Sequence, residues 1–414
     1  MERIKQLTSH LSGSSNGLPA LHRKSPDDVV VTMAIRSPLC KSKKGGFKDT
    51  RSDELLIEMF KKVIAHSKVD PALVQDICVG AVRIPDPVYE ARSAALAAGF
   101  PDTTPVQTIN RFCSSGLMSV TTISNQIRAG QIEIGLALGV ESMTAHPDKP
   151  ASPPSEEIAA HPVAKDCSMP MGWTSENVAQ DFDISREDMD AFAAMSFQRA
   201  EAAQKAGYFD REIVPFNAYA RDPGTGKRSI VVITKDDGIR PGTTREALGK
   251  VKPAFPQWGR AQTTGGNASQ ITDGVAAVML MTRRKAEELG LPILAKHVTT
   301  SVAGLAPRIM GIGPSIAIPM VLEKVGITKE DVDLFEINEA FASMYVYCVR
   351  KLGLDIDKVN VNGGAIALGH PLGCTGARQI ATGLNELERR GGKILVTSMC
   401  IGSGMGAAAV FVRD

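Results

Sequence analysis

The chain has 414 residues, of which 43% are hydrophobic and 22% are charged, and its formal net charge is +2. This length predicts roughly two or three domains around a large buried core. The small net charge gives no reason to expect nucleic acid or an anionic membrane surface as a partner. No apolar run reaches the length of about 18 residues that indicates a transmembrane helix.

The first 27 residues are polar and contain no apolar core of a secretory signal. Within them, Arg3 and Ile4 are followed after a short spacer by His10 and Leu11, a pattern that resembles an N-terminal peroxisomal targeting signal. On a helix the apolar residues of segment 3–11 would share one face. The pattern can also arise by chance in a leader without function. Residues 12–24 are rich in Ser and Gly and are typical of a linker.

A candidate nucleophile follows the predicted strand 105–110. Apolar residues recur at helical spacing from Ser114 to Gly130, so Cys113 lies where the strand ends and a helix begins. The unpaired N–H groups of a helix N-terminus favour the thiolate form of a cysteine. The alternative is a buried cysteine that acts as a small hydrophobic residue.

Residues 145–252 differ from the sequence on either side. A Pro-rich stretch at 147–154 is followed by a predicted helix at 185–206 and by charged, turn-rich sequence at 210–252. We interpret this region as an insertion that folds over one half of the protein and shapes a substrate mouth.

Two pairs of segments suggest an internal duplication. Residues 69–80 resemble 327–338, each with a polar turn before an apolar run, and residues 273–280 resemble 405–412, each a buried strand after a glycine-rich loop. The pattern predicts two similar α/β halves in which strands alternate with helices.

The second half contains three further candidates. Asn338 follows a predicted buried strand, where asparagine either caps a helix or holds a water molecule. His370 lies between Gly369 and Pro371 in a constrained loop before a predicted helix. Imidazole commonly takes the proton from a catalytic cysteine, although this histidine could also only cap the helix.

The third candidate is Cys400, which follows the predicted strand 393–397. Glycines recur at every second position from Gly402 to Gly406 and can present backbone N–H donors to a ligand. A dinucleotide-binding loop is excluded because the spacing is not GxGxxG and the next segment is predicted to be a strand.

These motifs together resemble the thiolase family, in the family's order and over residues 28–414. They are RSPLCKSKKGGFKDT, NRFCSSG, MGWTSENVA, NEAFA, GGAIALGHPLGCTGAR and CIGSGMG. The resemblance implies an α/β thiolase fold, which is a duplicated, layered αβαβα core with an inserted loop domain. The predicted boundaries are a leader and linker at 1–27, an N-terminal half at 28–144 plus 253–284, a loop domain at 145–252, and a C-terminal half at 285–414.

The resemblance also implies a reaction, the cleavage of 3-ketoacyl-CoA by free CoA in fatty acid β-oxidation. His370 would deprotonate Cys113, which would attack the C3 ketone. The acetyl-CoA enolate would be stabilised by His370 and a water molecule held by Asn338. Cys400 would protonate that enolate and then deprotonate the incoming CoA, while the N–H groups of Cys113 and Gly402 would bind the second oxyanion.

Further expectations follow from the same resemblance. Ser269 matches a serine that contacts the CoA arm, and Met171 matches a methionine of the acyl pocket. Pro170 stands where the short-chain acetoacetyl-CoA subtype is expected to have histidine, which favours a broader substrate range. CoA is a substrate, no resident cofactor or metal is implied, and a homodimer is expected. With this family the segment 3–11 indicates a peroxisomal import receptor as partner and the peroxisome as location.

Three other readings remain open at this point. One is a biosynthetic acetoacetyl-CoA thiolase. Another is a decarboxylating condensing enzyme, against which Cys400 argues, and the third is a non-catalytic acyl-CoA carrier, which would need neither thiol. The seven scattered cysteines contain no CxxC pair and predict neither a zinc site nor a disulfide framework. A regulatory disulfide between Cys113 and Cys167 is a separate hypothesis.

Overall fold

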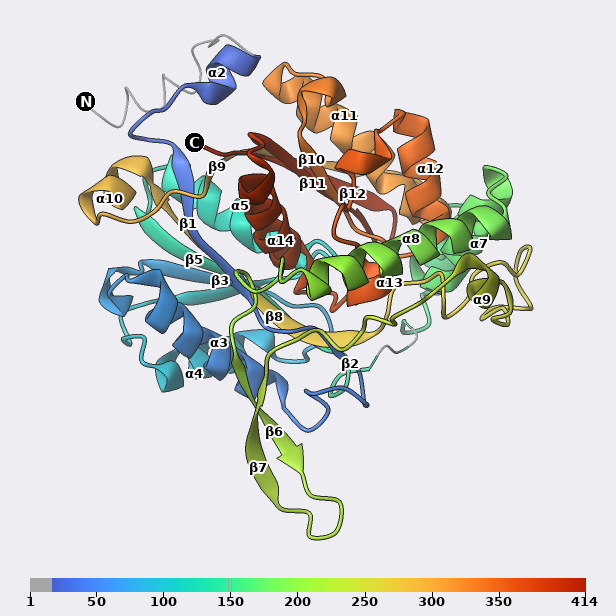
Figure 1. The fold of residues 1–414 in the computed structure, drawn as a ribbon, viewed down its shortest axis with the longest axis horizontal. Helices are drawn as coiled ribbons and strands as arrows, with labels where there is room; N and C mark the ends of the chain where they lie inside the picture. The colour runs from blue at the N-terminus through green and yellow to red at the C-terminus, as the bar shows by residue number, and fades with distance from the viewer. Residues whose placement is uncertain (1–16, 148, 150) are drawn as a thin grey trace.

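The computed structural model of the chain describes residues 17–147, 149 and 151–414 (Figure 1). In this part of the chain a ten-stranded sheet runs in the order β10-β11-β12-β9-β1-β8-β5-β3-β4, and β2 pairs with β8. The strands are β1 (Val29–Arg36), β2 (Cys40–Lys41), β3 (Asp76–Gly80), β4 (Val106–Ile109), β5 (Ile134–Ser142), β8 (Thr272–Thr282), β9 (Ala295–Gly304), β10 (Leu334–Ile337), β11 (Ile394–Ile401) and β12 (Met405–Val412).

The two halves of the sheet repeat one set of pairings. In the first half β3 is parallel to β5, β5 is antiparallel to β8, and β8 is antiparallel to β1. In the second half β10 is parallel to β11, β11 is antiparallel to β12, and β12 is antiparallel to β9. The halves join through β1 and β9 at only Val30–Lys296 and Val31–Ala295. Both pairs of similar sequence segments therefore occupy equivalent places, and the predicted duplication is confirmed.

Helices complete five layers (Figure 1). In the middle layer, α5 (Ser115–Arg128) and α14 (Thr375–Arg390) contact each other and the sheet halves on either side. The outer layers are formed by α3 (Ser52–Ser67) and α4 (Pro87–Ala98) on the first half and by α11 (Gly313–Val325) and α12 (Ala342–Leu352) on the second. Three apolar cores fill the spaces between the layers, one around the middle helices and one under the outer helices of each half, so the sheet is buried on both faces.

The inserted region forms α6 (Glu156–Ala160), α7 (Met171–Asp181), α8 (Arg186–Lys205), a hairpin of β6 (Phe216–Arg221) with β7 (Arg228–Ile233), and α9 (Arg245–Gly249). The predicted helix at 185–206 is confirmed, and the Ser185 hydroxyl caps it by accepting from the Asp188 N–H at 3.1 Å. The inserted region was predicted to fold over one half, but it contacts both. Helices α7 and α8 pack on α12 of the second half, whereas β6 contacts α3 of the first. The boundaries 145–252 stay a prediction.

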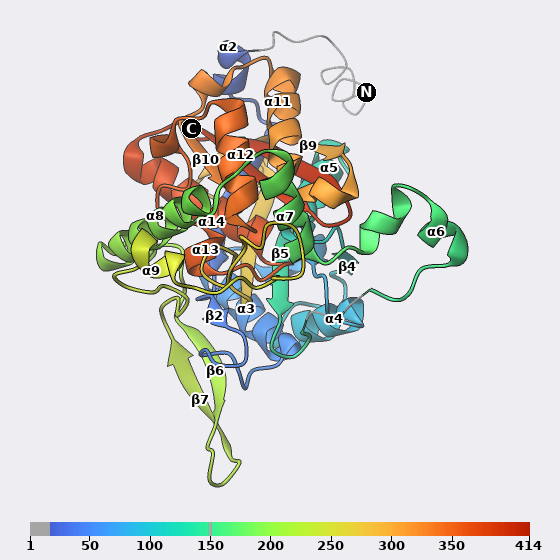
Figure 2. The same cartoon turned by 90° about the vertical axis from the view of Figure 1, so that its right-hand side faces the viewer.

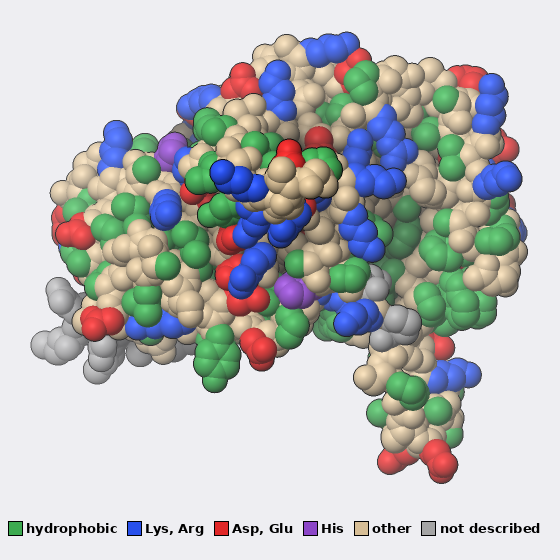
Figure 3. Space-filling model, turned by 90° about the horizontal axis from the view of Figure 1, so that it is seen from below, with side chains coloured by type: hydrophobic (Ala, Val, Ile, Leu, Met, Phe, Trp, Pro, Cys, Tyr) green, Lys and Arg blue, Asp and Glu red, His purple; other side chains and the backbone are tan. Residues whose placement is uncertain are grey.

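Two parts of this region project from the body. Figure 2 shows α6 standing out to one side and the hairpin extending below the layers. Figure 3 looks at the molecule from below, where charged and apolar side chains lie side by side. On the hairpin, Ile230 and Val232 are exposed whereas Phe216 and Ala218 are buried, which is the alternation expected of strands with one solvent face.

The segment before β1 is anchored to the second half. Leu21 of the short helix α2 (Leu18–His22) is buried in the outer core of that half, and the Gly17 N–H donates to the Val325 carbonyl at 3.0 Å. The predicted targeting pattern 3–11 lies outside the described residues. No helix in the described ranges is long and apolar enough to cross a membrane.

The halves meet most closely at the N-termini of α5 and α14, where glycines allow backbone to touch backbone. A Cβ atom on Gly139 would lie 2.3 Å from the Gly373 carbonyl oxygen, and one on Gly116 would lie 2.6 Å from the same atom. A Cβ on Gly373 would lie 2.3 Å from the Val140 carbonyl oxygen. Because no side chain fits between these segments, the loops that precede the two helices are forced together.

We predict that Gly139→Ala lowers the thermal unfolding midpoint, because the added methyl group collides with backbone that cannot move independently. Overpacking of this kind costs about 1–3 kcal/mol. The control is Gly249→Ala, since a Cβ there has no neighbour within 4 Å. An unchanged midpoint in Gly139→Ala, measured beside that control, would show that the contact tolerates a side chain.

Candidate active site

Cys113 lies in a tight turn between β4 and α5. The preceding Phe112 has φ 45°, a left-handed conformation that is unfavourable for a bulky residue. Two side chains hold the turn: the Asn110 Oδ1 accepts from the Phe112 N–H at 2.9 Å, and the Ser115 Oγ accepts from the Arg111 N–H at 2.9 Å. The thiol is therefore placed at the N-terminal end of α5, as predicted, with 8% of the residue exposed.

His370 lies in the loop between α13 (Ala365–Leu368) and α14. The Thr375 hydroxyl donates to the Pro371 carbonyl at 2.9 Å and lies 2.6 Å from the His370 Nδ1. Because that hydroxyl proton is already used, we assign the imidazole proton to Nδ1 and the lone pair to Nε2. Burial, with the nearby Arg378 charge, lowers the pKa of His370 to about 3. The imidazole is therefore neutral at physiological pH and able to accept a proton.

Asn338 follows β10 and faces the same imidazole. Its Nδ2 lies 3.3 Å from the His370 Nε2, and its backbone N–H donates to the Ser398 carbonyl at 2.9 Å. Its Oδ1 is buried and has no hydrogen-bond partner among the described residues. Of the two roles considered for Asn338, helix capping is excluded, because Phe341 is the N-cap of α12. The free Oδ1 suits a water molecule or a polar atom of a ligand.

Cys400 is fully buried within β11, which continues through it rather than ending at Thr397 as predicted. Its Sγ lies 3.3 Å from the Met344 Sδ of α12. Burial raises the pKa of Cys400 well above its usual value, and the proximity of Cys113 and Cys348 raises it further. The two candidate cysteines thus come from different halves of the fold and lie near each other, and Cys400 keeps its proton.

The remaining candidates surround these groups. Gly402 lies in the turn between β11 and β12, where a Cβ would be 3.4 Å from both the Met171 Cε and the Phe112 Cγ. Met171 begins α7 and packs against an apolar cluster that contains Cys400. Ser269 is placed by its backbone N–H, which donates to the Ala340 carbonyl at 2.9 Å. All seven residues proposed from the sequence therefore gather at the same end of the sheet.

Sequence reasoning missed two residues. Thr375 orients His370, and Met344 contacts Cys400. Thr375 is within the same motif as His370, so a search for a hydroxyl near the histidine could have found it. Met344 has no such signal, because only the packing of α12 against β11 brings it to Cys400. Cys40 is buried in β2, and burial with nearby Asp237 and Asp236 raises the pKa of its thiol.

Other candidate sites are limited. No group of three or more His, Cys, Asp or Glu able to hold a metal ion is found in the described part of the chain. All seven cysteines are free thiols. Cys167 is exposed in a short 3-10 helix (Ala164–Ser168), whereas Cys113 is buried, and a disulfide between them stays a prediction.

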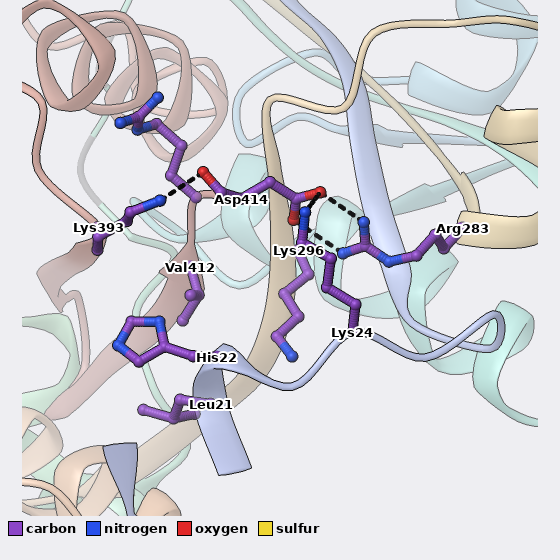
Figure 4. A pocket seen from close by; sticks show the side chains of 9 residues that line it. Leu21, His22, Lys24, Arg283, Lys296, Lys393, Val412 and Asp414 are labelled. Atoms are coloured by element: carbon purple, nitrogen blue, oxygen red, sulfur yellow. Dashed lines mark hydrogen bonds and ion pairs between the residues drawn. The ribbon is translucent and has the colours of Figure 1, made fainter. Parts of the chain in front are cut away.

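A pocket of about 480 Å³ lies between residues 21–24 and the C-terminal residues, away from these motifs (Figure 4). It is lined by Leu21, His22, Lys24, Arg283, Lys296, Lys393, Val412, Arg413 and Asp414. The Asp414 carboxylate pairs with Arg283 at 2.5 Å and with Lys24 at 3.2 Å. We interpret it as a junction that ties residues 21–24 to the C-terminal residues, because its charged groups already have partners.

Comparisons with known proteins agree with the motifs. A family model for the thiolase N-terminal domain matches residues 29–284, and one for the thiolase C-terminal domain matches residues 291–413. The peroxisomal 3-ketoacyl-CoA thiolase of Yarrowia lipolytica is 51% identical over 417 residues, which cover 100% of both chains.

Solved structures show the same likeness. The crystal structure of the dimeric peroxisomal thiolase of Saccharomyces cerevisiae has a TM-score of 0.89 and 47% identity, covering 96% of this chain and 100% of that one. Human mitochondrial 3-ketoacyl-CoA thiolase in complex with CoA has a TM-score of 0.82 and 37% identity, covering 94% and 98%. These matches confirm the family and the duplicated layered fold predicted from the sequence.

Proposed function

The chain belongs to the thiolase family, and we propose that it acts in the peroxisome as a 3-ketoacyl-CoA thiolase of fatty acid β-oxidation. It is an acetyl-CoA C-acyltransferase, which splits 3-ketoacyl-CoA with free CoA into acetyl-CoA and a shortened acyl-CoA. The observations that carry this proposal are two. Cys113 and Cys400, thiols from different halves, lie near each other, and the loop of the neutral His370 meets the start of α5, directly after Cys113.

Acylation begins at Cys113. Its thiol proton passes to the Nε2 of His370, whose Nδ1–H is held by Thr375. The thiolate attacks the C3 ketone, and the C2–C3 bond breaks with its electron pair moving to C2 and the thioester oxygen. A neutral histidine suits this step, because imidazolium could not accept the proton.

The enolate of acetyl-CoA is the leaving group, and its oxygen needs hydrogen-bond donors. The protonated His370 supplies one donor. A water molecule on Asn338 supplies the other, and the unpaired, buried Asn338 Oδ1 supports such a water position. Donors aimed at a developing oxyanion in a dry site commonly change the rate about 10²–10³-fold each.

Cys400 exchanges protons in both half-reactions. Its raised pKa keeps the thiol protonated until the C2 carbanion takes the proton, and the resulting thiolate then deprotonates the incoming CoA. The attack of the CoA sulfur on the acyl-enzyme forms a second oxyanion, which the backbone N–H groups of Cys113 and Gly402 bind. The close approach of Gly402 to Phe112, the neighbour of Cys113, supports this pairing.

Ser269 and Met171 bind the substrate in this proposal. Ser269 contacts the CoA arm, and Met171 lines the acyl pocket beside Cys400. The N-cap of α7 is Pro170, which offers no imidazole to narrow the pocket. This favours a broad range of acyl chains over the alternative function, which is a short-chain biosynthetic acetoacetyl-CoA thiolase.

Thiolysis by the purified protein with free CoA tests the proposal. We expect cleavage of both acetoacetyl-CoA and 3-ketohexadecanoyl-CoA. The reaction is monitored by the loss of the magnesium-enolate absorbance of each substrate. Cleavage of acetoacetyl-CoA alone would support the short-chain alternative. A protein that cleaves neither substrate would contradict the thiolase function.

The structure of the yeast relative is dimeric, and we propose that this chain forms a homodimer through the outer edge of β4. That strand ends the sheet order, so its outer edge can pair with another strand. Tyr89 and Val88 of α4 are exposed, and so is Phe112 beside the nucleophile. A mass in solution equal to one chain, measured by light scattering, would exclude the dimer.

Peroxisomal import is proposed to depend on Arg3, Ile4, His10 and Leu11, which would bind an import receptor. A fluorescent reporter fused to residues 1–25 should accumulate in peroxisomes. The same fusion with Arg3→Ala is the control, and equal distributions of the two reporters would refute the assignment.

A further inference from the structure

One buried carboxylate touches the loops of both catalytic halves. Glu141, at the end of β5, is fully buried. Its Oε2 accepts from the Gly373 N–H at 3.0 Å and from the Val82 N–H at 3.1 Å, and its Oε1 accepts from the Arg83 N–H at 3.0 Å. Gly373 belongs to the His370 loop, whereas Val82 and Arg83 follow β3 in the first half.

The hydrogen bonds continue from there to the nucleophile. The Val82 carbonyl accepts from the Asn110 Nδ2 at 3.2 Å, and the Asn110 Oδ1 accepts from the Phe112 N–H at 2.9 Å. Phe112 holds the left-handed turn immediately before Cys113. A continuous path of hydrogen bonds therefore joins the loop of the base to the loop of the nucleophile, with Glu141 and Asn110 as its two side chains.

We infer that Glu141 is a positioning residue that fixes the Cys113 thiol relative to the His370 imidazole across the boundary between the halves. This inference rests on the proposed function, because it assigns a purpose to the alignment of those two groups. Three N–H groups that belong to irregular loops find their acceptor on one carboxylate. Bonds from N–H groups to a carboxylate are stronger than bonds between neutral groups, and a loop held by several of them has little freedom.

The buried position of Glu141 disfavours the ionised form of its carboxyl group. Burial raises the pKa of Glu141 to about 7, although its three N–H donors and the Arg83 charge oppose this effect. A neutral amide could not replace the Glu141 carboxylate, because both carboxylate oxygens accept hydrogen bonds and an amide has only one oxygen. Strongly perturbed carboxyl groups are commonly found where a protein needs them for its function, and the nearest functional groups here are the two loops that Glu141 joins.

Glu141→Gln is the direct test. The shape of the side chain is kept, but the amide nitrogen donates, so at least one of the three backbone N–H groups faces another donor. We expect kcat for thiolysis to fall about 10–100-fold while KM for CoA changes less than about twofold, because small misplacements of reacting groups affect the chemical step. Alkylation of Cys113 by iodoacetamide, followed by mass spectrometry of its peptide, should slow by a similar factor.

The matched control is Asp76→Asn. Asp76 is also a buried carboxylate, on the neighbouring strand β3, but it accepts from Gln107 and Gln126 and lies away from both catalytic loops. It should keep the parental kcat and alkylation rate. If the Glu141 variant behaves as this control does, the inference is wrong.

Asn110→Ala tests the same path at its other side chain and serves if Glu141→Gln does not fold. It should lower kcat and slow Cys113 alkylation, again with little change in KM. Combined with Glu141→Gln, its effects should be less than additive, because both variants break one path. Fully additive losses would contradict the coupling. Alkylation needs no substrate, so it separates failure of this inference from failure of the thiolase function.

Discussion

The active site depends on a contact between backbones at the centre of the molecule. The N-terminal turns of α5 and α14 approach so closely that Gly116 and Gly139 leave no space for a side chain against the Gly373 carbonyl. Each helix begins directly after a loop that carries a proposed catalytic group, Cys113 before α5 and His370 before α14. The duplicated fold places the two helices in one layer, and the glycines set how near their N-termini come.

Different surroundings then give chemically similar groups different tasks. Cys113 lies at a helix N-terminus near the protein surface, whereas Cys400 is fully buried beside Met344 with a strongly raised pKa. One thiol is therefore suited to nucleophilic attack and the other to holding a proton. His370 is kept neutral by burial and by Arg378, so it can serve as the first base. Burial in the same interior accounts for the protonation states of both Cys400 and His370.

Much of this arrangement could be predicted from the sequence, because its signals are local. Glycines indicated a constrained loop at His370 and backbone donors beside Cys400, and helical patterns predicted α5, α8 and α14. The family, the duplicated fold and the 3-ketoacyl-CoA thiolase function agree with the comparisons. Residues whose roles depend on contacts distant in the chain were missed. Glu141 joins segments 58 and 232 residues away, and no periodicity or motif reports such a contact.

Some local predictions also failed for a physical reason. Asn338 looked like a possible helix cap, but the chain runs on to Phe341 before α12 begins, which leaves the Asn338 amide facing His370. The inserted region was expected to lie over one half, yet α8 packs against the second half and the hairpin packs against the first. Where an exposed helix or hairpin docks is decided by tertiary packing, and its own periodicity does not encode the partner.

The most direct test of the account is to identify the residue that carries the acyl group. Cys400→Ala should still form the acyl-enzyme but should release it slowly, since no thiolate remains to deprotonate CoA. After incubation of this variant with 3-ketohexadecanoyl-CoA, peptide mass spectrometry should find the shortened acyl group on Cys113. An acyl group on another residue, or a Cys113 that stays unmodified while acetyl-CoA is released, would contradict it.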